Sequence, residues 1–151
     1  MLSPALLGPI DVLAEEVVGG VTIIEFILLG LVTVNLAIRG LAHRNIITTA
    51  RDQGADALSR SVALDVSNVL IVLGGFYYIT VHVHGGVVFT VLAIGLLLTD
   101  FFEFESRIVE ARTEVPLERP KAALVASSFV FLYIAYQSLF FIIRPIWELV
   151  I

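Results

Sequence analysis

Long apolar stretches alternate with short polar segments along the chain. Four stretches, residues 17–38, 61–81, 86–104 and 121–143, approach or exceed the roughly 20 apolar residues that a helix needs to cross a bilayer core of about 30 Å. Backbone in hydrocarbon must satisfy its own hydrogen bonds, which favours helices over loops or open strands. The pattern predicts an all-α polytopic membrane protein, with one four-transmembrane-helix bundle as the single domain 1–151.

The polar segments predict how the bundle is oriented. Eight of the nine basic residues fall in or beside the loops 39–60 and 105–120, and Arg144 is the exception. Short loops rich in Arg and Lys mark the cytoplasmic face. We therefore expect a multi-pass protein of the cell membrane with cytoplasmic basic loops. Both termini and the 82–86 turn are expected outside.

Two further helical segments are predicted outside the spans. Pro9 and Asp11, followed by an apolar pattern, indicate a short N-terminal interfacial helix, because an acidic residue near a helix start is favourable. Charged residues recur at spacings of three and four across residues 100–114, which predicts that the third helix continues beyond the membrane. Pro116 is the expected stop.

Composition narrows the function classes. The chain is 58% hydrophobic, lacks cysteine and carries a formal charge of −5, which excludes thiol catalysis and disfavours nucleic-acid binding. Lys121 is the single lysine beside eight arginines. This acidic, lysine-poor composition resembles that of small multi-pass membrane proteins of halophilic archaea with no assigned function. The resemblance rests on composition and implies no site residues.

Polar residues inside the predicted spans are the main candidates for chemistry, because charges there are costly. If the second and third spans form a hairpin near His84, Asp100 lies opposite Asn68, and Asp65 lies opposite Glu103. Such a cluster would suit a cation or proton, since carboxylate and amide oxygens are hard ligands. The alternative is helix packing, with the acidic residues satisfied by nearby arginines such as Arg60 and Arg107.

Glu25 lies about eight residues inside the predicted outer edge, or about 12 Å at 1.5 Å per residue. Its expected partners are Arg144, a histidine of the outer turn, a tyrosine, Gln137 or its own proton. A pair with Arg144 would be structural. A protonated Glu25 facing a cavity would instead indicate proton or cation handling.

The outer turn contains His82 and His84, and the glycines after them favour a tight connection between two helices. Together with Arg144, these histidines form a candidate outer interfacial site. Two ligands without a third make a poor metal site, so a structural or pH-sensitive role is favoured. Tyr77, Tyr78 and Trp147 are typical of an outer aromatic belt. This position explains the three residues without any further role.

Catalytic templates such as a phosphate-binding loop, HExxH or GxSxG are absent, so we predict no catalytic residue, metal or cofactor. The first hypothesis is a noncatalytic membrane protein that self-assembles or serves as an accessory subunit. Its expected partners are lipids, further copies or other membrane subunits, and not nucleic acid. A small oligomeric cation or proton transporter is the alternative, and a quinone- or metal-linked respiratory subunit is less favoured.

Overall fold

The computed structural model describes residues 8–151 and consists mainly of four long helices. They are α1 (Ile23–Gln53), α2 (Val62–Val81), α3 (Val83–Arg112) and α4 (Lys121–Val150). Each helix is long and apolar enough to cross a membrane. The predictions of an all-α four-helix bundle and of a multi-pass membrane protein are therefore confirmed.

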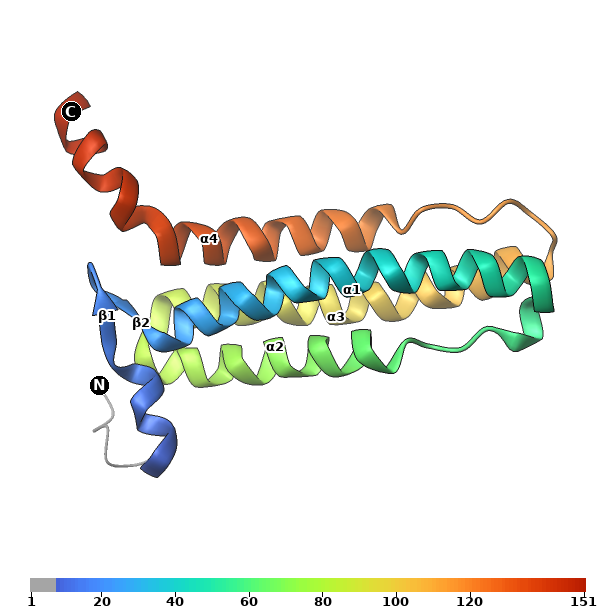
Figure 1. Cartoon of the computed structure of the whole chain (residues 1–151), viewed down its shortest axis with the longest axis horizontal. Helices are drawn as coiled ribbons and strands as arrows, with labels where there is room; N and C mark the ends of the chain where they lie inside the picture. Colours follow the sequence, from blue (N-terminus) through green and yellow to red (C-terminus); the bar gives the residue numbers. More distant parts are fainter. Residues whose placement is uncertain (1–7) are drawn as a thin grey trace.

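The helices pack side by side around one apolar core (Figure 1). The main contacts of α1 are with α2 and α4, and those of α3 are with the same two helices. Apolar side chains fill the centre because residues spaced three and four apart share one face of a helix. The fully buried apolar residues include Leu28, Val32, Ile71, Phe89, Val130 and Ile134.

The bundle has two chemically different ends (Figure 1). We call one the histidine end; it carries the segment 8–22, the connection at His82 and the C-terminus. The opposite end, called the arginine end, carries the connections 54–61 and 113–120. An even number of long helices, as predicted, places the connections 54–61 and 113–120 at one end of the bundle and the segment 8–22 and the C-terminus at the other.

The first span begins later than predicted. Residues 17 and 18 belong to strand β1 (Glu16–Val18), which pairs antiparallel with β2 (Val21–Thr22) before α1 starts. The hairpin forms because Gly19 and Gly20 both adopt positive φ, which glycine tolerates without steric cost. Helix α1 then continues to Gln53, so most of the predicted loop 39–60 is helical.

The connection between α2 and α3 is shorter than the predicted 82–86 turn. Only His82 separates the two helices, and Gly85 and Gly86 lie within α3. A Cβ on Gly86 would lie 2.3 Å from the backbone nitrogen of Ile79. Gly86 therefore permits close packing of α3 on α2 rather than forming the turn.

The ends of the chain also differ in detail from the predictions. The N-terminal helix exists as the 3₁₀ segment η2 (Gly8–Ala14), and a second short 3₁₀ segment, η3 (Ala55–Ala57), lies in the first connection. The predicted continuation of α3 is confirmed, although it ends at Arg112 before Pro116 is reached. Helix α4 begins at Lys121 as predicted and extends past residue 143.

Candidate functional site

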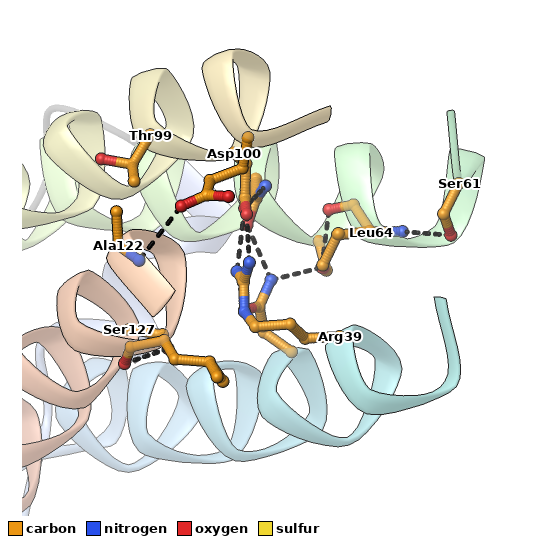
Figure 2. Close-up of polar contacts among 12 residues, drawn as sticks. Arg39, Ser61, Leu64, Thr99, Asp100, Ala122 and Ser127 are labelled. Carbon is orange, nitrogen blue, oxygen red and sulfur yellow. Dashed lines mark hydrogen bonds and ion pairs between the residues drawn. The ribbon is translucent and has the colours of Figure 1, made fainter. Parts of the chain in front are cut away.

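A buried ion pair joins α1 to α3 near the arginine end. Arg39 and Asp100 are only 3% and 6% exposed, and the guanidinium binds both carboxylate oxygens. Nη2 donates to Oδ2 at 2.8 Å, while Nη1 donates to Oδ1. Figure 2 shows Arg39 reaching across from α1 towards Asp100. The predicted intramembrane acid is thus matched by a cation of the same chain.

Three uncharged side chains extend this pair into a network. Asn68 donates to Asp100 Oδ2 at 2.6 Å, which confirms that these residues lie opposite each other. Asn35 donates to Ser67 Oγ and Asn68 Oδ1, both at 2.7 Å, and accepts from Arg39 Nη2 at 3.0 Å. The hydrogen bonds therefore tie α1, α2 and α3 together through polar groups that would be costly to bury alone.

Asp65 lies in the first turn of α2, where Arg60 binds it from the preceding connection. Arg60 Nε and Nη2 donate to the two carboxylate oxygens of Asp65 at 3.0 and 2.9 Å. The guanidinium also lies 5.2 Å from the ring centroids of Phe101 and Phe104 on α3. The hydrogen bond to Asp65 raises the pKa of Arg60 above its usual value.

Glu103, the remaining member of the predicted inner cluster, connects α3 to α4. Its Oε2 lies 3.5 Å from Arg107 Nη2, and its Oε1 accepts from the Ala122 backbone nitrogen at 3.1 Å. An acceptor at the start of α4 satisfies an amide that has no partner within the helix. Asp65 and Glu103 are therefore satisfied by nearby arginines and a backbone amide, as the helix-packing alternative expected.

The three acidic residues of the inner cluster line one cavity of about 60 Å³ at the arginine end. Its charged lining consists of three arginines and three carboxylates: Arg39, Arg60, Arg107, Asp65, Asp100 and Glu103. His43 also lines the cavity. The formal charges of these six side chains balance. Such a set can bind helices together, but a cation entering it would have to compete with the arginines.

Glu25 is buried in the first turn of α1, because the helix begins at Ile23 rather than at the predicted residue 17. Its Oε2 accepts from the backbone nitrogen and hydroxyl of Thr22 at 2.7 and 2.9 Å. Its Oε1 accepts from the Tyr78 hydroxyl at 2.7 Å. The bond from the Thr22 backbone nitrogen belongs to a capping box, in which the side chain of the third helical residue accepts from the N-cap backbone. The carboxylate thus fixes both the start of α1 and its contact with α2.

The outer candidates share a crevice of about 440 Å³ at the histidine end. Glu25, His82, His84 and Arg144 all line it, together with aromatic residues of α4. Within residues 8–151, however, the hydrogen bonds to the Glu25 carboxylate come from Thr22 and Tyr78, and Arg144 instead binds Glu148 at 2.9 Å. The ring of His82 lies edge-on to Tyr78, with centroids 5.9 Å apart.

The described part of the chain brings no three His, Asp or Glu side chains together as a metal would require. Glu25 makes hydrogen bonds with Thr22 and Tyr78, and both histidines are exposed. The crevice lining mixes acidic, basic and aromatic groups without favouring one class of ligand.

Sequence reasoning missed two central residues. The sequence pattern places Arg39 in a cytoplasmic loop and Tyr78 in the outer aromatic belt, whereas both side chains are buried within the bundle. A signal for Arg39 exists in the spacing of Leu28, Val32, Asn35 and Arg39, which at intervals of four, three and four share one helix face. Extending the first helix beyond residue 38 would have brought Arg39 onto the buried face.

Four long apolar helices, tied by buried polar groups near both ends, define a multi-pass helical membrane protein. The chain belongs to the family described as a domain of unknown function (DUF7313), whose sequence model matches residues 3–151. No curated protein and no solved structure matches it.

Proposed function

We propose that this protein is a noncatalytic membrane subunit that assembles through the outward face of α1, either with a second copy or with another membrane protein. The carrying observation is that Glu25, Asp65 and Asp100 are all engaged by donors of their own chain. The hydrogen bonds and ion pairs of these carboxylates are made within the chain and stabilise the bundle. This arrangement supports a structural role over a reaction or a transported ion.

The outward face of α1 supports assembly because it carries small residues that the bundle leaves exposed. Gly30, Thr33, Ala37 and Gly40 are all exposed there. A Cβ at Gly30 or Gly40 would meet nothing within 4 Å, unlike one at Gly86. Glycine within a helix costs about 1 kcal/mol relative to alanine. In membranes such small residues let two helix backbones approach closely.

Cysteine cross-linking tests the proposal cleanly, because the chain has no cysteine of its own. Val34→Cys places a thiol on the α1 face at 54% exposure. Matched controls are Leu73→Cys on α2 and Leu132→Cys on α4, which are 57% and 62% exposed. If α1 meets a second copy, oxidation in the native membrane forms a dimer at position 34 and little at the controls. Equal dimer yields at all three positions would contradict assembly through α1.

A second variant covers assembly with a different protein. Gly40→Leu adds bulk to the proposed interface at a site where the Cβ meets no neighbour, so the bundle itself should remain folded. The mass of the native assembly, purified gently at high salt to suit the acidic composition, should fall with this variant. An unchanged mass together with an absent position-34 dimer would refute the proposal.

A small cation or proton transporter is the second candidate, supported by the convergence of Asp65, Asp100 and Glu103 on one cavity. It ranks lower because the arginines already balance these carboxylates. Flux across vesicles containing the purified protein separates the two functions. Ion or proton flux that Asp100→Asn abolishes, with assembly intact, would favour transport. The quinone- or metal-linked subunit would require a coloured protein or stoichiometric metal.

A further inference from the structure

The last ten residues of the chain, 142–151, leave the bundle, and we call them the C-terminal arm. Every residue of the arm is exposed. Pro145 lies inside α4 and lacks the N–H that would bond the preceding turn, which is a common cause of helix bending. Figure 1 shows this part of α4 leaning away from the other helices at the histidine end. The bundle therefore supplies no cover for the arm.

The arm is too apolar to remain in water. Seven of its ten residues are large apolar residues with exposures from 52% to 87%: Ile142, Ile143, Ile146, Trp147, Leu149, Val150 and Ile151. Contiguous apolar surface of this kind marks a contact with a membrane or with another protein.

The two charged residues of the arm lie together on one side of its helix. Arg144 and Glu148 are four residues apart, and Arg144 Nε donates to Glu148 Oε1 at 2.9 Å. At about 100° per residue, the opposite side is centred near Ile146, and Trp147 falls close to the boundary. An apolar face opposite a charged side, with a tryptophan at the boundary between them, suits a helix that lies in the membrane–water interface.

We propose that the C-terminal arm lies in the lipid interface at the histidine end, with its apolar face in the boundary between headgroups and acyl chains. Lipid is favoured over a protein because Arg144 and Glu148 neutralise each other and leave no net charge to select a partner. The segment Gly8–Ala14 at the same end also exposes apolar residues, Ile10 and Val12, as a shared lipid interface would require. This inference does not depend on which partner α1 binds.

Trp147 is the single tryptophan, so its fluorescence reports on the arm alone. The full-length protein is reconstituted in phosphatidylcholine vesicles whose acyl chains carry bromine at shallow, middle or deep positions. Lipid bromines quench a neighbouring tryptophan, and we expect the shallow position to quench most strongly. The emission should not change with the protein-to-lipid ratio. If a second copy of the protein covered the arm instead, every brominated lipid would quench weakly, and the Trp147 emission would shift on dilution with lipid.

Charge placement provides the matched test. Ile146→Asp puts a carboxylate at the centre of the apolar face, whereas Ile151→Asp adds the same charge near the polar stripe. Ile146→Asp should lower the shallow-bromine quenching by about half or more, and Ile151→Asp should change it much less. Both positions lie outside the bundle, so helix content and assembly mass serve as folding controls. Equal effects of the two variants, or strongest quenching by deep bromine, would overturn the proposal.

Discussion

Arg39→Met removes the guanidinium that binds both oxygens of Asp100 and one oxygen of Asn35. Removing one partner from a buried ion pair costs about 3–5 kcal/mol, because the other charge is left uncompensated. The same range applies to Asp100→Asn, which leaves Arg39 buried beside a neutral amide. If the two effects were independent, the double variant would lose about 6–10 kcal/mol by their sum.

The structure predicts a much smaller loss for the double variant. Both charges are then gone, and the Asn35 oxygen is the main group left without its donor, at a cost of about 1–3 kcal/mol. Reversible unfolding in mixed micelles, followed by helix content as the SDS fraction rises, measures all four proteins. The control is an unchanged assembly mass before unfolding. Additivity of the two single effects within about 0.5 kcal/mol would refute the description of this pair as a coupled unit.

The remaining predictions concern α2 and its neighbours, and the same unfolding assay measures them. Tyr78→Phe should destabilise the fold by about 1.5–3 kcal/mol, because the Glu25 carboxylate loses a buried donor, whereas exposed Tyr136→Phe should cost under about 0.5 kcal/mol. Similar losses of unfolding free energy for Tyr78→Phe and Tyr136→Phe would contradict a stabilising hydrogen bond from Tyr78 to Glu25. Gly86→Ala should cost about 1–3 kcal/mol or more, because its Cβ would enter the α2 backbone. Gly30→Ala, which meets open space, should be neutral or stabilising by up to about 1 kcal/mol in the monomer.

Hydrophobic length alone was enough to predict the four helices, and a hairpin of the second and third spans near His84 correctly placed Asn68 opposite Asp100. Both successes rest on regular geometry, since rise per residue and the membrane thickness constrain long apolar helices strongly. Boundaries were less predictable. Residues 17–22 are apolar enough to extend a span, yet two glycines with positive φ form a hairpin there instead.

The candidate site was predictable where partners share a hairpin and unpredictable where they come from distant helices. Arg60 and Asp65 lie five residues apart, so their pairing was within reach of the sequence. Arg39 and Asp100 are 61 residues apart and meet only because α1 continues as a helix past the expected membrane boundary. A positive charge is normally expected in a loop, which is why the inner cation was missed.

The vertical spacing of the polar groups bears on the choice between a subunit and a transporter. Two polar clusters include residues of α1, one around Glu25 and the other around Asn35 and Arg39. Glu25 and Asn35 are ten residues apart, which is about 15 Å along the helix axis. Leu28 and Val32 occupy the same buried face between them, and Phe89 of α3 is buried in the same apolar cluster. A proton or ion crossing a single bundle would have to pass this apolar layer. A path between copies would avoid this layer, so the assembly state bears on both candidate functions, and the outward face of α1 is the surface to probe.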